Sequence, residues 1–195
     1  PVRFISNHSS GKMGFALAET ALSLGAEVKL ISGPTDQSTS SNKINLVKIK
    51  TGAQMQKAII NDYNESDIVI MAAAVSDYKP TEFSKKKIKK DNKEINIKLE
   101  KTTDILMELG KTKKNQILVG FALENNDELS NAKNKLKKKN LDLIVLNSLN
   151  DEGAGFGYDT NKVTVIGRSG EETAYQLKEK TDVANDIFKH IIKLI

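Results

Sequence analysis

Short apolar runs of strand length alternate with amphipathic runs of helix length along most of this 195-residue chain. In the longer runs apolar residues recur every three or four positions, which predicts helices with one buried face. The shorter runs are nearly continuous in apolar residues, which is typical of parallel strands covered on both faces. The chain is therefore predicted to form an α/β fold, a parallel sheet flanked by helices. The predicted strands are residues 27–32, 45–49, 67–71, 116–121 and 143–147, and the predicted helices are residues 12–24, 52–63, 126–139 and 182–194.

The remaining segments add smaller elements to this sheet. Residues 162–166 and 172–175 are expected to pair across a glycine-containing turn, as a small antiparallel extension. Residues 94–100 alternate strictly between polar and apolar and predict a half-exposed strand. Thr103 is expected to cap a short helix that ends near Gly110.

The start of the chain departs from the usual order of a Rossmann-like sheet. Such a sheet begins with a strand and a glycine-rich turn before its first helix. Here Pro1 leads directly into the loop before the first helix, so we expect the first strand to be missing from this sequence. No linker and no second apolar core interrupt the pattern, which favours a single domain over residues 1–195.

Composition excludes several kinds of site. The chain has no cysteine, so it offers no disulfide, no thiolate ligand and no cysteine nucleophile, and its two histidines are too few for a histidine metal cluster. No apolar run reaches the roughly 20 residues of a membrane span, and the N-terminal residues lack the order of a signal peptide. We therefore expect a cytoplasmic protein without a membrane partner.

The positive charge is concentrated in one segment. Residues 84–101 hold eight lysines and three acidic residues. The net charge of this segment is therefore the same as the net charge of +5 for the whole chain. Two interpretations stay open here, a solvated lysine-rich loop and a local site for anions.

A polar loop precedes the first predicted helix. Ser9, Ser10 and Gly11 open that helix, and the free N–H groups of a helix N-terminus attract anions. The loop is not a P-loop, because Ser6 and Met13 stand where a Walker motif needs a glycine and a hydroxyl residue. The alternative is a serine-capped helix without a ligand.

Small residues follow the strand at 67–71. Ala72 and Ala73 lie where ligands bind in open α/β sheets, beyond the carboxyl end of a strand, and Asp77 is placed to accept from a ribose hydroxyl or to hold a metal. Ordinary packing and turn chemistry is the alternative. Lys135 and Lys139 are four residues apart on a predicted helix, so they share a face that suits a triphosphate.

Taken in order, five segments resemble the synthetase half of the bacterial phosphopantothenoylcysteine decarboxylase/synthetase family, the phosphopantothenate–cysteine ligases. They are PVRFISNHSSGKMGFALAE at residues 1–19, AAAVSDYKP at 72–80, KIKK at 87–90, VGFALE at 119–124 and KLKKKNLDLIVLN at 135–147. Five matches in the same order with compatible spacing make this resemblance specific.

The resemblance implies a ligase of coenzyme A biosynthesis. It would join 4′-phosphopantothenate to L-cysteine through a phosphopantothenoyl-CMP intermediate, using CTP and releasing pyrophosphate and CMP. Catalytic roles fall on Lys87, which would stabilise charge while the intermediate forms, and on Asn7, which would bind the intermediate. Ser9, Ser10 and Gly11 complete the predicted substrate loop. The positions that match nucleotide contacts are Met71, Ala72, Ala73, Asp77, Lys87, Thr103, Asp104, Ile105, Leu106, Phe121, Lys135 and Lys139.

The resemblance also implies Mg2+ with the triphosphate, although it leaves the metal ligands unknown, and a homodimer to which the strand near residues 94–100 contributes. No flavin is expected on this chain. Two other functions were weighed, a nicotinamide-dependent oxidoreductase of the same fold class and a basic nucleic-acid-binding domain. The first lacks its glycine fingerprint, and the second lacks aromatic residues among its lysines, so neither is favoured.

Overall fold

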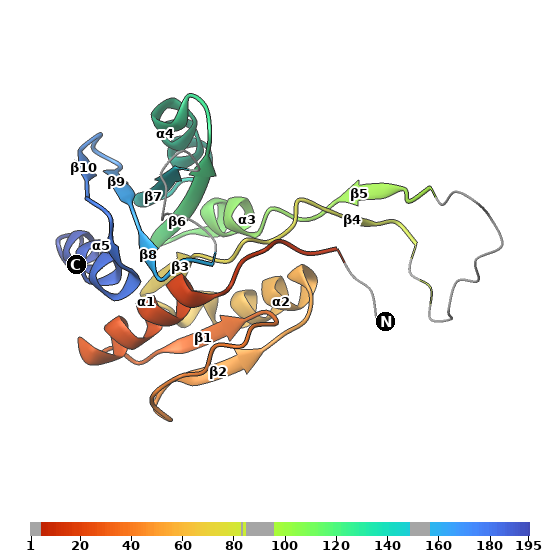
Figure 1. The fold of residues 1–195 in the computed structure, drawn as a ribbon, viewed down its shortest axis with the longest axis horizontal. Coiled ribbons are helices and arrows are strands. Elements are labelled where there is room, and N and C mark those ends of the chain that lie inside the picture. Colours follow the sequence, from red (N-terminus) through yellow and green to blue (C-terminus); the bar gives the residue numbers. More distant parts are fainter. Residues whose placement is uncertain (1–4, 83, 85–95, 149–156) are drawn as a thin grey trace.

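A parallel core with an antiparallel flank forms the main sheet of the chain (Figure 1). The computed structural model describes residues 5–82, 84, 96–148 and 157–195. The sheet has the order β10-β9-β7-β6-β3, in which β3, β6 and β7 run parallel and β9 and β10 are antiparallel. The strands are β3 (Ile68–Met71), β6 (Ile117–Glu124), β7 (Leu143–Ser148), β9 (Val163–Gly167) and β10 (Glu172–Ala174). The predicted α/β class and the antiparallel extension are confirmed.

Helices cover both faces of this sheet. Along each strand, alternate side chains point to opposite faces, so one apolar run supplies two cores. Val145 packs in the core with α1 and α5, whereas its neighbours Ile144 and Leu146 pack in the core with α2, α3 and α4. In the described part of the chain the α-helices are α1 (Lys12–Ser23), α2 (Gly52–Asp62), α3 (Ile105–Thr112), α4 (Glu128–Lys138) and α5 (Lys180–Ile192).

Three strand pairs lie outside the main sheet. The parallel strands β1 (Lys29–Ser32) and β2 (Asn45–Lys48) lie beside α1 and α2, and a short 3-10 helix (Tyr63–Glu65) follows α2. The antiparallel pair of β8 (Thr160–Asn161) and β11 (Lys178–Glu179) leads into α5. The pair β1–β2 confirms the two strands predicted at 27–32 and 45–49, although β1 begins two residues later and β2 ends one residue earlier than predicted.

A narrow arm projects from the body (Figure 1). It contains β4 (Tyr78–Pro80) and β5 (Leu99–Lys101), which pair antiparallel. The predicted strand at residues 94–100 is therefore too long at its start, because residues 96–98 are not strand and β5 begins only at Leu99. Residues 94 and 95 lie outside the described residues.

The predicted cap of the third helix is displaced by one residue. Asp104, not Thr103, is the N-cap of α3, and its carboxylate accepts from the backbone N–H of Met107 at 3.0 Å. Both residue types cap helices well, and a carboxylate at a helix N-terminus also benefits from the helix dipole. The helix continues to Thr112, two residues beyond the predicted end.

Among the described residues, no helix combines the length and the apolar composition that a membrane span needs.

Candidate active site

The polar loop before α1 lies between the ends of two strands. The Asn7 side-chain amide donates to the Ala74 carbonyl, just beyond β3, at 2.6 Å. The Thr35 hydroxyl, just beyond β1, donates to the Ser10 carbonyl at 2.6 Å. We call residues 7–11 the serine loop. These two hydrogen bonds hold the serine loop at the carboxyl edge of the strands, where open α/β sheets bind ligands.

Gly11 has a conformation that the loop requires. Its φ of +79° lies in the left-handed region, and a Cβ there would come within 3.0 Å of the Thr35 hydroxyl oxygen. A side chain would thus be strained and would push against the residue that holds the loop. The backbone N–H of Phe15 bonds to the Gly11 carbonyl at 3.1 Å, so the loop passes directly into α1.

The segment after β3 is joined to the segment before α3. Thr102 donates from its hydroxyl to the Ser76 carbonyl at 2.6 Å and from its backbone N–H to the Asp77 carbonyl at 2.9 Å. This double contact brings Asp77 beside Thr103 and Asp104 in the fold. Predicted nucleotide contacts from two segments that are far apart in sequence, Asp77 in one and Thr103 in the other, are therefore close together.

Lys139, at the end of α4, contacts the same set of residues through Asp104. Its ammonium lies 2.8 Å from one Asp104 carboxylate oxygen and donates to the other at 3.1 Å. Partial burial acts to raise the pKa of Asp104, but the hydrogen bonds from Lys139 and from the Met107 N–H outweigh it, so the pKa lies below its ordinary value. The Asp104 carboxylate is therefore ionised at neutral pH.

A glycine allows α3 and α4 to come together at this point. A Cβ on Gly110 would lie 1.9 Å from the Lys139 carbonyl oxygen, and the Asn140 side-chain amide donates to the Gly110 carbonyl at 2.9 Å. The end of α4 thus rests directly on the backbone of α3. This contact places the Lys139 side chain near the start of α3.

Lys135 is one turn earlier on α4 and pairs with the Glu124 carboxylate at the end of β6. The two lysines are predicted as cations for a triphosphate, and the ammonium of each is paired with a carboxylate. An ammonium group has three N–H donors, so a carboxylate partner does not prevent either lysine from binding a phosphate oxygen. Their role as nucleotide contacts stays a prediction.

Most of the apolar predicted contacts lie on β3, β6 and α3. Met71 at the end of β3 is in register with Gly120 on β6. A Cβ on Gly120 would come within 2.7 Å of Leu106, so the missing side chain makes room for that leucine. Phe121, the next residue on β6, is half-buried and packs with Ala72 against the opposite core.

The other apolar predicted contact, Ile105, is buried at the first position of α3, and Ala73 is exposed. Ser9, like Ser10 and Gly11, is partly exposed. Lys87, which has a predicted catalytic role, lies outside the described residues.

Asn147 is a candidate that the sequence reasoning missed. It lies near the carboxyl end of β7, between Leu123 on β6 and Val163 on β9. Its Oδ1 is the one buried side-chain oxygen or nitrogen without a hydrogen-bond partner in the described part of the chain. An unpaired buried acceptor is costly, so a ligand that donates a hydrogen bond is a physical reason for its presence. The only signal in the sequence is a polar residue that ends an apolar strand run.

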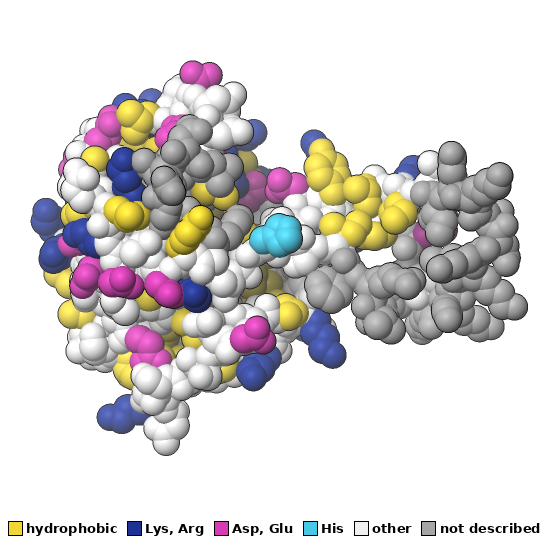
Figure 2. Space-filling model, viewed as in Figure 1, with side chains coloured by type: hydrophobic (Ala, Val, Ile, Leu, Met, Phe, Trp, Pro, Cys, Tyr) yellow, Lys and Arg dark blue, Asp and Glu magenta, His cyan; other side chains and the backbone are white. Residues whose placement is uncertain are grey.

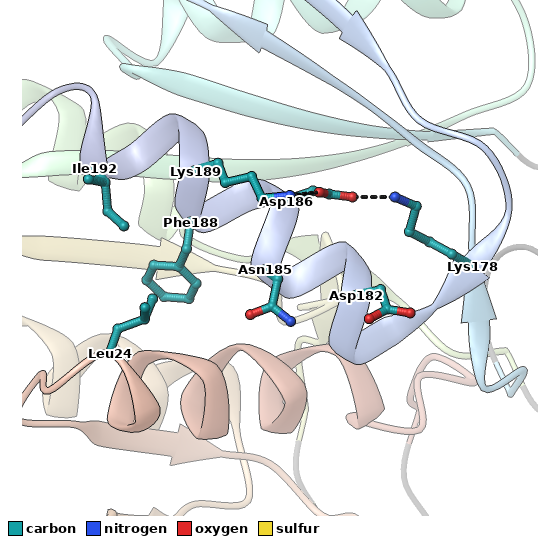
Figure 3. A pocket seen from close by; sticks show the side chains of 8 residues that line it. All are labelled: Leu24, Lys178, Asp182, Asn185, Asp186, Phe188, Lys189 and Ile192. Carbon is teal, nitrogen blue, oxygen red and sulfur yellow. Dashed lines mark hydrogen bonds and ion pairs between the residues drawn. The ribbon is translucent and has the colours of Figure 1, made fainter.

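A cavity in the described structure lies elsewhere (Figure 3). It has a volume of about 550 Å3 and lies along α5, near Leu24 at the end of α1. Its central carboxylate, Asp186, is 4% exposed and pairs with Lys178 at 2.6 Å and Lys189 at 2.8 Å. The Asp186 carboxylate is thus paired with two ammonium groups, and the cavity contains none of the predicted site residues. The carboxyl edge of the sheet, where the predicted residues lie, therefore stays the candidate active site.

The fold defines the class of the protein, a Rossmann-like domain, and domains of this class bind ligands beyond the carboxyl ends of their parallel strands. The chain belongs to the family described as the DNA/pantothenate metabolism flavoprotein C-terminal domain, whose model matches residues 1–195. The resemblance found in the sequence is thereby confirmed.

Curated relatives agree with this membership. The chain is 53% identical over its full length to a protein named cysteine/cysteine sulfinic acid decarboxylase from an unknown prokaryotic organism, and covers 55% of that protein. It is 45% identical over its full length to the coenzyme A biosynthesis bifunctional protein CoaBC of Bacillus subtilis, and covers 48% of it. The chain thus spans about half the length of these relatives.

A solved structure shares the fold. The crystal structure of the C-terminal domain of coenzyme A biosynthesis bifunctional protein CoaBC is 40% identical, with a TM-score of 0.82, and the match covers 98% of this chain and 86% of that one. The similarity therefore extends over nearly the whole of this fold.

Proposed function

We propose that this chain is a phosphopantothenate–cysteine ligase domain of coenzyme A biosynthesis that uses CTP. The observation that carries the proposal is the meeting of the serine loop, the segment at Asp77 and the Asp104–Lys139 pair in a chain that matches the family over its whole length. The relative from Bacillus subtilis is named for the same pathway. We treat residues 1–195 as one CTP-binding domain.

In the first step, a carboxylate oxygen of 4′-phosphopantothenate attacks the α-phosphorus of CTP. The bond between the α-phosphorus and the bridging oxygen breaks, and pyrophosphate leaves. Lys87 stabilises the charge that develops on the phosphoryl oxygens, as cations do in such transfers. Lys139 and Lys135 bind phosphate oxygens beside their carboxylate partners Asp104 and Glu124.

In the second step, the amine of cysteine attacks the carbonyl carbon of the acyl-cytidylate. The bond from that carbon to the phosphate oxygen breaks, so CMP leaves and an amide forms. Asn7 holds the intermediate, because its amide lies at the carboxyl edge of β3, where Ala74 fixes its position. A neutral amide can donate to a developing oxyanion without adding a charge.

Magnesium enters the proposal as the cation that accompanies the triphosphate. Among the described residues, no three His, Asp or Glu side chains gather closely enough to hold a metal ion. Mg2+ in nucleotide sites is usually held by one or two carboxylates together with phosphates and water, so such a cluster is not required. The cation would lower the charge that the lysines must offset.

The arm formed by β4 and β5 supports the proposal of a homodimer. Hydrophobic side chains gather along it (Figure 2), and Tyr78, Ile97 and Leu99 are 48%, 62% and 44% exposed. A projecting two-stranded ribbon with apolar side chains is poorly stable alone and favours pairing with another surface. Leu99→Ser should shift the protein from dimer to monomer in sedimentation velocity, and unchanged sedimentation would contradict this role of the arm.

The family description concerns the C-terminal domain of a flavoprotein. We therefore assign flavin binding and decarboxylation to another domain, and neither to this chain. The charged substrates of the proposed reaction are metabolites that do not cross membranes freely, so we propose that the reaction takes place in the cytoplasm.

The test uses the natural polypeptide that carries this chain. Pyrophosphate should appear from CTP only when 4′-phosphopantothenate is present, and CMP only after cysteine is added. Release of carbon dioxide from cysteine is measured in parallel, because one relative is named as a decarboxylase of that compound. Absence of pyrophosphate with both substrates present would refute the proposal.

Two variants separate the steps. Lys87→Gln should abolish pyrophosphate release, whereas Asn7→Asp should release pyrophosphate and accumulate the acyl-cytidylate. Equal loss of both steps in both variants would contradict the separate roles of these residues.

A further inference from the structure

Two lysines from different helices hold the turn before β8. Lys12, the first residue of α1, donates to the Gly157 carbonyl at 3.1 Å and to the Asp159 carboxylate at 2.6 Å. Lys180, the first residue of α5, donates to the carbonyls of Tyr158 and Thr160. We call Lys12, Asp159 and Lys180 the lysine clamp. The clamp fixes the turn 157–160 to the starts of two helices.

Lys180 is the buried member of the clamp. It is only 7% exposed, which is unusual for a lysine. Burial lowers its pKa, the nearby charge of Lys12 lowers it further, and Asp159 acts in the opposite direction. Its backbone N–H also bonds to the Asp159 carbonyl at 3.0 Å, so side chain and backbone hold the same turn.

Asp159 is placed differently from Lys180. Its side chain is 75% exposed, whereas that of Lys12 is 28% exposed. Exposed ion pairs contribute little to folding stability, so loss of the Asp159 carboxylate should leave the stability of the protein nearly unchanged. The Lys12 ammonium holds the pKa of Asp159 below its ordinary value, so the pair is charged at neutral pH.

The clamp acts on the helix that carries the serine loop. Lys12 directly follows Gly11, and the Ser10 carbonyl is held from the other side by the Thr35 hydroxyl. The start of α1 is thus fixed between β1 on one side and the turn before β8 on the other (Figure 1). Small displacements of a substrate loop are costly, because catalysis needs the reacting groups in a narrow range of positions.

We infer that Asp159 is a positioning residue of the ligase site, which holds Lys12 through an ion pair above the buried Lys180 and thereby fixes the serine loop for the substrate. This inference rests on the proposed function, because it names the residues that organise its substrate loop. Asp159 itself touches no reacting group in the proposed mechanism.

The first test compares two substitutions that each remove one exposed ion pair. Asp159→Asn removes the partner of Lys12, and the control Asp62→Asn removes the partner of Lys29 at the end of α2, where β1 begins. We expect Asp159→Asn to raise the KM for 4′-phosphopantothenate about 5- to 20-fold with a smaller change in kcat. The control variant should keep the KM of the unchanged protein, and both variants should keep its melting temperature.

The second test is independent of catalysis. In hydrogen exchange, the amides at the start of α1 should exchange faster in Asp159→Asn than in Asp62→Asn. Asp159→Glu, which keeps the charge, should restore most of the protection and most of the KM. Lys12→Gln combined with Asp159→Asn should be no worse than Lys12→Gln alone, because Lys12→Gln already removes the ion pair.

The outcomes distinguish the two proposals. If the unchanged protein is active but Asp159→Asn has the same KM and the same exchange as Asp62→Asn, the positioning role is refuted and the ligase proposal stands. If the unchanged protein releases no pyrophosphate, the ligase proposal fails, and the exchange experiment still decides whether Asp159 fixes the start of α1.

Discussion

The contact between α3 and α4 makes a quantitative prediction for Gly110→Ala. The new Cβ would lie 1.9 Å from the Lys139 carbonyl oxygen, against an ordinary contact of at least 3.4 Å, so the end of α4 must move by about 1.5 Å. Both atoms are fixed by backbone, and rotation of a side chain cannot relieve the overlap. The shift should break the Asn140 bond to the Gly110 carbonyl and weaken the Lys139–Asp104 pair.

Three effects decide whether Gly110→Ala raises or lowers the unfolding free energy. Replacing glycine by alanine inside a helix stabilises by about 1 kcal/mol. Overpacking costs about 1–3 kcal/mol. Loss of the Asn140 hydrogen bond costs about 1 kcal/mol more. The net result is a loss of about 1–3 kcal/mol of unfolding free energy, so packing outweighs helix propensity at Gly110.

Denaturant unfolding measures this difference against a matched variant. Gly14→Ala also places an alanine inside a helix, α1, but its Cβ would meet no atom within 4 Å. It should stabilise the protein by up to about 1 kcal/mol. If Gly110→Ala is as stable as Gly14→Ala, the close approach of the helices is refuted. Affinity for CTP should also fall in Gly110→Ala alone, since Lys139 moves with the end of α4.

Three further predictions concern single side chains. Asn147→Leu should raise the unfolding free energy by about 1 kcal/mol, because it removes an unpaired buried acceptor. The same change should weaken ligand binding in calorimetry. A less stable variant with normal binding would show that the amide is structural. Gly11→Ala should raise the KM for 4′-phosphopantothenate by strain at φ +79° and contact with Thr35, and an unchanged KM would contradict the loop geometry. Burial, followed by the charge of Lys193, lowers the pKa of His190 below its ordinary 6.5, so the unfolded chain binds more protons in that interval. The unfolding free energy should therefore fall as the pH drops below about 6.5 and level off below the folded-state pKa; His190→Gln should remove this dependence, and an identical pH profile in both proteins would count against it.

Much of the fold was predictable because the same physical condition repeats along the chain. Parallel strands covered on both faces must be apolar at nearly every position, as in the run that contains Val145, and that pattern cannot be mistaken for an exposed loop. The β9–β10 pair was predictable for a related reason, since the glycine-containing turn between the two runs favours a hairpin. The bounds of elements were less certain, as the one-residue displacement of the α3 cap from Thr103 to Asp104 shows.

The contacts within the site depend on distances that no sequence pattern contains. Lys135 and Lys139 were predicted as a pair on one helix face, but their partners Glu124 and Asp104 come from different elements. The close contact between the end of α4 and α3, which brings Lys139 to α3, depends on Gly110. In the sequence, Gly110 indicates only the end of a helix. Long-range pairing of this kind follows from packing, so it appears only in the folded structure.

The central claim, that the substrate carboxylate attacks the α-phosphorus of CTP, is tested most directly by oxygen labelling. 4′-Phosphopantothenate with both carboxylate oxygens replaced by 18O is incubated with CTP, Mg2+, cysteine and the natural polypeptide, and the products are analysed by mass spectrometry. One 18O atom should appear in CMP and none in pyrophosphate, because the attacking oxygen leaves with the cytidylate. CMP without the label, or label in pyrophosphate, would contradict the acyl-cytidylate mechanism.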